Sequence, residues 1–274
     1  DLIDTAFVMQ DRLEDFQRGI NVLRKLTDGK VHLGVQNGGA SEKVFADIQG
    51  VQINKFSGPH PAGNVGIQIH HTDPINKGEY VWYAKPQDIA NMGCLFRTGQ
   101  YQPRRKVAVA GQGLKDHFYV DTYVGAGVLP MLKNNLKENR KLRIISGNVL
   151  TGGAIEPDNY ISYYDDLLTV IDEGDEPELF GWILPSYPRP SLSGTFPWRY
   201  TEDMRFEVNT NLHGEERAFV VTGQYERVLP MDIFPVFLLK AILTEDIERM
   251  EQLGIYESAA EDFALCEFVC TSKI

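Results

Sequence analysis

Residues 56–71 read FSGPHPAGNVGIQIHH and place a segment rich in glycine and proline between two apolar runs. Glycine permits positive φ and close approach of the backbone to a ligand or another chain. Proline fixes φ and removes a backbone donor. The segment is therefore predicted to form a loop of one defined shape, which leads into a strand carrying His70 and His71. Its candidate ligand-binding residues are Gly58, His60, Gly63, Gly66 and His70.

The chain before this loop alternates between strand-like and helix-like segments. Apolar runs at 5–9, 31–34 and 51–56 predict strands, residues 13–23 have the spacing of one helix face, and Ser41 can begin a second helix. This order predicts a parallel sheet with helices on its faces, as in part of a Rossmann-like layer. Ligands bind beyond the carboxyl ends of such strands, where the glycine–proline loop lies. The G-x-G-x-x-G phosphate fingerprint is missing there.

The sequence after the loop predicts three further structural regions. Candidate strands around one helix indicate a small β-grasp domain. The basic run 104–106 near its start could dock an acidic partner or phosphate, but a solvated linker is the favoured interpretation. The predicted strands are 107–110, 118–123, 142–146, 160–164, 167–171, 179–184, 205–209 and 217–223, and the predicted helices include 87–98 and 125–136. The predicted domains are a partial Rossmann-like α/β domain at 1–102, a β-grasp domain at 103–176, a β-rich extension at 177–229 and a C-terminal helical region at 230–274.

The composition excludes some classes of function. The net charge of −11 opposes non-specific binding to nucleic acid and to anionic membrane surfaces. No apolar run approaches the roughly 20 residues of a membrane-spanning helix. Three cysteines among 274 residues argue for a reducing compartment without a disulfide framework. No P-loop, G-x-S-x-G, H-E-x-x-H or Cys–His pattern is present, so no catalytic residue is assigned.

Cys266 and Cys270 are four positions apart in the predicted final helix and would face one side. Such a pair could donate two ligands to a metal or an iron–sulfur cluster. Zinc needs four ligands, and only Cys94 remains elsewhere. The favoured interpretation is two small buried side chains, and no metal site is assigned.

Three histidines lie within the loop and the strand predicted after it. His60, His70 and His71 could bind a metal or relay protons to a bound ligand. Neighbouring side chains of a strand point to opposite faces, so His70 and His71 could not serve one site. Hydrogen bonding by His60 within the loop is the favoured interpretation.

A second glycine-rich segment follows the strand predicted at 142–146. Ser146 and Asn148 could bind a polar ligand there, but a hairpin-like turn is favoured. Gly111 and Gly113 are likewise interpreted as turn residues, because the third glycine of a phosphate loop is missing.

Four motifs occur together in this chain: SGPHPAGNVG (57–66), RIISGNVLTG (143–152), LPMDIFPVFLLK (229–240) and EDFALCEFVC (261–270). In this order they resemble the NqrA family, the A subunits of the bacterial Na⁺-translocating NADH:quinone reductase. The resemblance covers nearly all of the chain. It implies a soluble-ligand-binding β-grasp module, and a further N-terminal region before Asp1. It also implies a relationship to the NADH-binding subunit of respiratory complex I, with the cysteine pair as a vestige of a cluster region.

The resemblance implies a peripheral subunit on the cytoplasmic face of the bacterial inner membrane. The complex would pass electrons from NADH through flavins and an iron centre to quinone, coupled to Na⁺ export. Other subunits would carry those cofactors and be the partners of this chain. Two roles stay open: a docking subunit without a ligand site, and a quinone-binding subunit that uses Phe56, His60 and His70. A residual nucleotide site is a third alternative.

Overall fold

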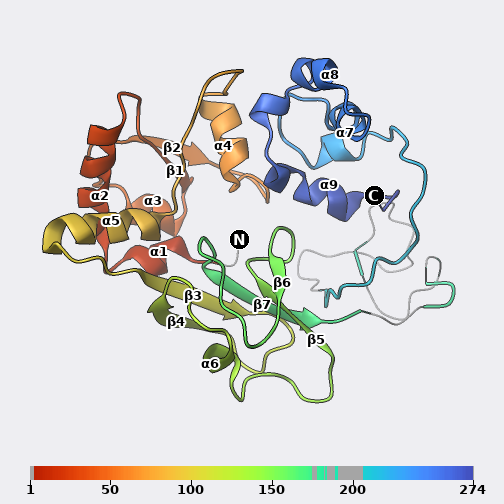
Figure 1. Cartoon of the computed structure of the whole chain (residues 1–274), viewed down its shortest axis with the longest axis horizontal. Helices are drawn as coiled ribbons and strands as arrows, with labels where there is room; N and C mark the ends of the chain where they lie inside the picture. Colours follow the sequence, from red (N-terminus) through yellow and green to blue (C-terminus); the bar gives the residue numbers. More distant parts are fainter. Residues whose placement is uncertain (1–2, 175–177, 182, 184–188, 191–205, 274) are drawn as a thin grey trace. The chain divides into compact units, whose positions relative to one another are not determined.

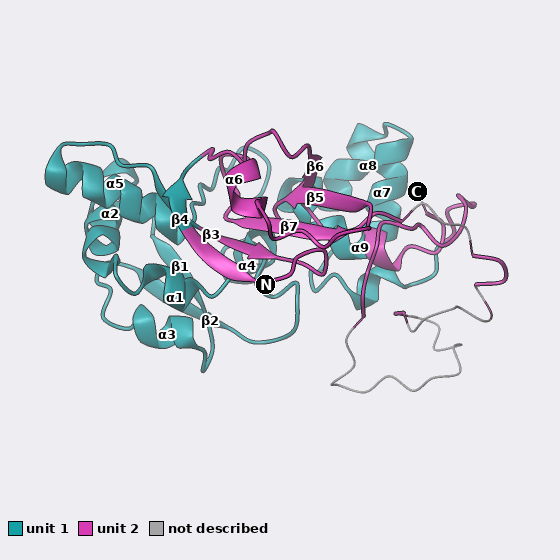
Figure 2. Ribbon diagram, turned by 90° about the horizontal axis from the view of Figure 1, so that it is seen from below, with its two compact units in different colours: residues 1–106, 121–124, 221–266 teal, residues 107–120, 125–220, 267–274 magenta. Residues whose placement is uncertain are grey.

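The computed structural model describes residues 3–174, 178–181, 183, 189–190 and 206–273 (Figure 1). The chain divides into two compact units (Figure 2). Unit 1 comprises residues 1–106, 121–124 and 221–266, and unit 2 comprises residues 107–120, 125–220 and 267–274. The four-domain division remains a prediction.

A pair of packed helices forms one side of unit 1. Helix α2 (Leu13–Leu26) and helix α5 (Pro86–Thr98) approach so closely that a Cβ on Gly19 would collide with the carbonyl of Ile89. Gly99 ends α5 in the left-handed conformation, with φ 71°, which glycine adopts without strain. Both helices were predicted.

Residues 5–9 form helix α1 (Thr5–Met9), so the strand predicted there is wrong. The Asp4 carboxylate accepts hydrogen bonds from the backbone N–H groups of Ala6 and Phe7, at 3.0 and 3.2 Å. This N-cap stabilises the first turn of a helix. A five-residue apolar run has no periodicity that distinguishes helix from strand, which explains the error.

Strands β1 (His32–Gln36) and β2 (Gln52–Phe56) form a parallel two-stranded sheet in unit 1. His32 pairs with Gln52 and Gln36 with Phe56, and helix α3 (Ala40–Val44) lies in the connection between the strands. The predicted parallel pairing is confirmed.

Residues 65–72 form helix α4 (Val65–Thr72), not the strand predicted for His70 and His71. The Ile–Gln–Ile alternation resembles a strand, but Ile67 is buried and His70, three positions later, lies on the same helix face. The backbone N–H of Gln68 donates to the carbonyl of Asn64, at 3.1 Å, as in the first turn of a helix.

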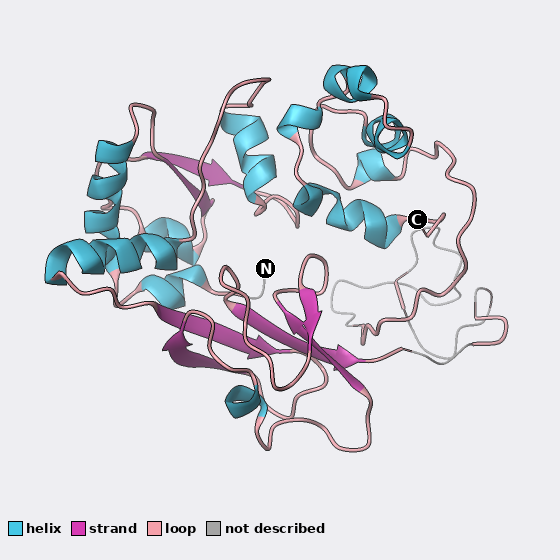
Figure 3. Cartoon of the chain, in the orientation of Figure 1, coloured by secondary structure: helices cyan, strands magenta, loops and turns pink. Residues whose placement is uncertain are grey.

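Unit 2 contains most of a five-stranded mixed sheet (Figure 3). Strand β3 runs parallel to β7, and β5 is antiparallel to both β7 and β6. Helix α6 is short. The order is β4 (Phe118–Tyr123), β3 (Arg104–Ala110), β7 (Leu167–Asp172), β5 (Leu142–Ser146) and β6 (Gly153–Ile155), and α6 spans Leu129–Leu132.

The core of unit 2 is built from apolar side chains of β3, β5 and β7 and of the segment around α6, among them Val107, Val109, Val128, Leu132, Ile144, Leu168 and Val170. The strand predicted at 160–164 is wrong: Tyr160 makes one isolated antiparallel bridge, to Gly127, and the backbone N–H of Ile161 donates to the carbonyl of Ala126, but no strand forms. With both units described, the fold is a mixed α/β structure, as predicted.

The basic run 104–106 is not a solvated linker, because it begins strand β3. Arg105 is 1% exposed, and its Nη2 donates to Oδ1 of Asp88 at 2.7 Å. The backbone N–H of Lys106 donates to Oε1 of Gln87, and the carbonyl of Lys106 accepts a hydrogen bond from Nε2 of Gln87. These contacts lie within unit 1, where they hold the start of β3 against α5.

The C-terminal region is helical, as predicted. It contains α7 (Pro235–Leu243), α8 (Ile247–Gln252) and α9 (Ala264–Val269), with 3₁₀ turns η2 (Ile255–Glu257) and η3 (Ala260–Phe263) between them. In the described part of the chain, no helix combines the length and hydropathy needed to span a bilayer.

The β-rich extension predicted at 177–229 differs from the structure where residues are described. Residues 217–223 form no strand, and residues 206–209 contribute only one isolated bridge, between Asn209 and Asp172. The predicted strand 179–184 lies partly outside the described residues.

Candidate functional site

The glycine–proline loop follows β2 at the carboxyl edge of the parallel sheet. Gly58 has φ +135°, a conformation that side chains disfavour. Two turns shape the loop, with the N–H of Ala62 bonded to Pro59 and that of Asn64 to Pro61. The prediction of a loop of defined shape is confirmed by this hydrogen bonding.

Helix α4 packs from the loop onto the sheet. The side-chain amide of Gln68 donates back to the carbonyls of Ala62 and Gly63, both at 3.4 Å. A Cβ on Gly34 of β1 would collide with the same Gln68 side chain. Gln68 therefore joins the loop, α4 and the sheet.

Both ring nitrogens of His70 are hydrogen-bonded by residues of the C-terminal segment of unit 1, residues 221–266. Its Nδ1 lies 2.7 Å from Oε2 of Glu257, and its Nε2 accepts the backbone N–H of Asp232 at 3.0 Å. Because Nε2 accepts, the proton of the neutral ring is on Nδ1 and is donated to Glu257. The ring is mostly buried, at 11% exposed. His70 thus has neither nitrogen available to a ligand carbonyl in this arrangement.

His71 contacts the same segment from the adjacent position. Its Nε2 lies 2.8 Å from the carbonyl oxygen of Pro230 and donates to it. Since α4 is a helix, the strand argument that separated His70 from His71 no longer applies, and both side chains bind the C-terminal segment.

Gly66 allows a buried carboxyl to approach α4. A Cβ at this position would collide with both carboxyl oxygens of Asp262, which is 2% exposed. The Asp262 carboxyl also accepts the backbone N–H of Ala259 at 2.9 Å. Burial raises the pKa of the Asp262 carboxyl, while the Ala259 hydrogen bond and nearby His70 oppose that rise.

His60 lies half-buried in the loop. Burial lowers the pKa of its imidazole, and the nearby carboxylate of Glu261 partly opposes this effect. A lowered pKa favours the neutral ring at pH 7, in which one nitrogen donates and the other accepts.

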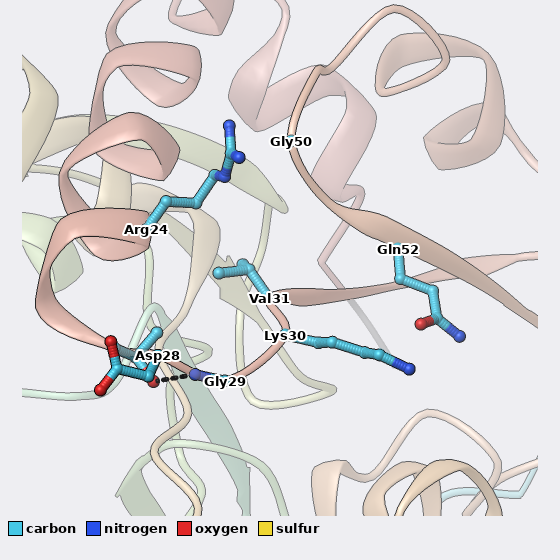
Figure 4. Close-up of a pocket in the computed structure, with 8 residues that line it drawn as sticks. Arg24, Asp28, Gly29, Lys30, Val31, Gly50 and Gln52 are labelled. Carbon is cyan, nitrogen blue, oxygen red and sulfur yellow. Dashed lines mark hydrogen bonds between the residues drawn. The ribbon is translucent and has the colours of Figure 1, made fainter.

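A surface pocket of about 330 Å³ lies at the opposite, amino-terminal edge of the β1–β2 sheet (Figure 4). It is lined by Arg24, Thr27, Asp28, Gly29, Lys30, Val31, Gly50 and Gln52. The Arg24, Asp28 and Lys30 side chains point in different directions, and the Gly29 N–H donates to the Thr27 hydroxyl. This polar lining does not suit an apolar ring, and no candidate residue from the loop contributes to it.

The segment 147–152 forms the turn of the β5–β6 hairpin, which supports the favoured interpretation. The Ser146 hydroxyl donates to Asp165 at 2.6 Å and accepts the N–H of Ser162. The Asn148 side chain accepts the N–H groups of Leu150 and Thr151. The Asn148 side chain therefore serves the turn itself, and the Ser146 hydroxyl links the end of β5 to the segment that precedes β7.

The two C-terminal cysteines are buried, with Cys266 1% and Cys270 3% exposed. This burial fits their interpretation as small packing side chains. Among the described residues, no group of three or more His, Cys, Asp or Glu side chains is placed to hold a metal ion.

The residues that engage α4 from the C-terminal segment were missed by sequence reasoning. Pro230, Asp232 and Asp262 lie in the motifs at 229–240 and 261–270, but nothing in those motifs indicated a contact with α4. Glu257 lies outside both motifs. All of these residues lie more than 150 positions from the histidines or glycine that they contact.

These features define a mixed α/β protein in which a shaped loop and a short helix bind the C-terminal segment. Residues 2–101 match the family model described as the NqrA second alpha/beta domain, and residues 106–156 match the NQRA C-terminal domain. Three relatives, each named as the A subunit of Na(+)-translocating NADH-quinone reductase, come from Rhodopirellula baltica, Serratia proteamaculans and Photorhabdus laumondii. They are 40%, 40% and 39% identical over 98%, 98% and 95% of this chain.

The chain belongs to the NqrA family. It covers 59%, 60% and 58% of the three relatives' own lengths, so it spans somewhat more than half of the proteins that it matches.

Proposed function

We propose that this chain serves as the NqrA subunit of a Na⁺-translocating NADH–quinone reductase and acts there by docking, without catalytic residues of its own. The proposal rests on about 40% identity, over 98% of the chain, to relatives named as the A subunit of Na(+)-translocating NADH-quinone reductase. The complex would carry electrons from NADH through flavins and an iron centre to quinone, coupled to Na⁺ export. Its cofactors would be held by other subunits, and this chain would lie peripherally on the cytoplasmic face of the inner membrane.

The geometry supports docking over chemistry. His70, the candidate donor to a quinone carbonyl, is bound through both nitrogens within the chain. The one pocket described above is polar and lies away from the loop. We further propose a Rossmann-like layer around β1 and β2, a β-grasp module around β3 to β7, and a common origin with the NADH-binding subunit of complex I.

Co-expression tests the docking role. The chain, with an affinity tag, is produced together with the remaining reductase subunits from the same genome, and the tagged complex is purified in detergent. The proposal predicts recovery of those subunits in equimolar amounts. Recovery of the tagged chain alone, from membranes that contain the other subunits, would contradict it.

A second candidate function is quinone binding at the loop, which His60 favours. Its ring lies half-buried in the loop, and an imidazole N–H is a suitable donor to a quinone carbonyl. Titration with a short-chain ubiquinone, followed by tryptophan fluorescence, tests this candidate. Saturable quenching that is lost in His60→Ala and kept in His71→Ala would support it, whereas equal affinity in all three proteins would remove His60 from any quinone site.

A further inference from the structure

Residues 80–84 (YVWYA) connect α4 to α5 in unit 1 and expose four consecutive large side chains. Tyr80 is 91% exposed, Val81 45%, Trp82 94% and Tyr83 66%. Isolated apolar residues on a surface are normal, but contiguous ones mark interaction sites. Tyrosine and tryptophan contribute strongly to such sites because each buries a large rigid area.

The backbone of this segment also lacks partners in the part of the chain that the structure describes. Residues 80–84 belong to no helix or strand, and they make no hydrogen bond with any described residue. Exposed backbone N–H and C=O groups without a protein partner bond to water and are available for pairing with another strand. Tyrosine, valine and tryptophan are among the residues most enriched in strands. The segment therefore has the composition of a strand without the pairing of one.

The sheet of the same unit is small. Among the described residues of unit 1, β1 pairs only with β2, so one edge of each strand is open. An isolated two-stranded pairing is marginally stable, and parallel sheets are usually larger and covered on both faces. Unit 1 thus combines an undersized parallel sheet with an unpaired strand-like segment.

We propose that residues 80–84 are a β-strand that pairs with a strand from outside these 274 residues. We assign that strand to the part of the NqrA protein that the relatives have beyond the aligned region, since this chain covers only 59% of the Rhodopirellula baltica protein. Successive side chains of a strand face opposite sides. Tyr80 and Trp82 would pack on one face of the completed sheet, and Val81 and Tyr83 on the other. The inference does not depend on the docking function.

Two proteins test the proposal: the 274-residue chain, and a chimera in which it replaces the aligned region of the Rhodopirellula baltica protein. Trp182→Phe and Trp198→Phe in both leave Trp82 as the only tryptophan of the 274-residue part. In the chain alone we expect the emission of a water-exposed tryptophan and unprotected amides at 81–84. In the chimera we expect a blue shift and amide exchange slowed about tenfold or more.

Val81→Pro in the chimera removes one backbone donor, and it is expected to restore fast exchange at 80–84. Val81→Ile is the matched control and should keep the protection. In the 274-residue chain, where the segment is unpaired, Val81→Pro should leave thermal melting unchanged, which separates lost pairing from misfolding.

Four results would overturn the proposal. The first is slow amide exchange at residues 81–84 in the 274-residue chain together with a doubling of its mass, which would make a second copy of the chain the partner. The second is an exposed Trp82 in the chimera that becomes buried only when other reductase subunits are added. The third is protection that survives Val81→Pro, and the fourth is a chimera that does not fold.

Discussion

Nδ1 of His70 lies 2.7 Å from Oε2 of Glu257, although the two residues are 187 positions apart in the chain. The same ring accepts the backbone N–H of Asp232 through Nε2. One side chain therefore holds helix α4 to two points of the C-terminal segment, and the glycine–proline loop that precedes α4 is held with it.

Removing this contact should destabilise unit 1. His70→Ala leaves the Asp232 N–H and the partly buried Glu257 carboxylate without this partner, which is expected to cost about 1–3 kcal/mol in the free energy of unfolding. His71→Ala, whose ring is exposed, is the matched control and should cost about 0.5–1.5 kcal/mol at most. Urea denaturation followed by circular dichroism measures both, and equal losses would contradict the assigned role of His70.

Gly66→Ala should also weaken the packing of α4 against the C-terminal segment, because the added methyl group collides with the Asp262 carboxyl. The expected cost is about 1–3 kcal/mol. Gly153→Ala is the control, since a Cβ there meets nothing within 4 Å. In Gly66→Ala/Asp262→Ala the collision is gone, so the two changes should be clearly non-additive. Additive losses in a double-mutant cycle would show that the two residues do not meet.

The buried ion pair between Arg105 and Asp88 should be sensitive to loss of one partner. Asp88→Asn leaves the guanidinium, which is 1% exposed, without this carboxylate and is expected to cost about 3–5 kcal/mol. Asp11→Asn, which removes the longer 3.8 Å pair to Lys106, should cost less than about 1 kcal/mol. A comparable effect of both changes would argue that Arg105 is hydrated in solution.

The side chains of His60 and Asp262 predict opposite dependences of the free energy of unfolding on pH. The folded-state pKa of His60 is lowered, so its contribution to stability is present above the unfolded value near 6.5 and is lost as pH falls through the folded value. The folded-state pKa of Asp262 is raised from 3.8, so its contribution is present below that value and is lost as pH rises through the folded value. In His60→Asn the free energy of unfolding should change less with pH just below pH 6.5 than in the unmodified chain. In Asp262→Asn it should change less with pH above pH 3.8. NMR titration of both groups checks the directions independently.

The sequence predicted the elements that have a clear local signature. Helices α2 and α5 have apolar periodicity, Gly99 caps α5, and β1 and β2 alternate with helices in the order that parallel strands require. The hairpin turn after Ser146 was also the favoured interpretation, since glycine and asparagine mark such turns.

Two of the errors, at α4 and at the start of β3, share one physical cause: contacts with distant residues decided the conformation. Helix α4 is short, and its β-branched residues suit a strand, but Gln68, His70 and His71 find their partners only in a helix packed between the sheet and the C-terminal segment. Arg105 belongs to a basic run that is typical of a linker, yet it is buried because Asp88 neutralises it. No local pattern encodes either partner.

Binding to the rest of the reductase tests the central claim, that this chain acts by docking and not by chemistry of its own. The purified chain is titrated against detergent-solubilised reductase that lacks its NqrA subunit, and the complex is measured by sedimentation velocity with and without a short-chain ubiquinone. The account predicts a saturable one-to-one complex whose affinity is independent of quinone and unchanged by His60→Ala. Failure to bind, or binding that requires quinone and is lost in His60→Ala, would contradict it.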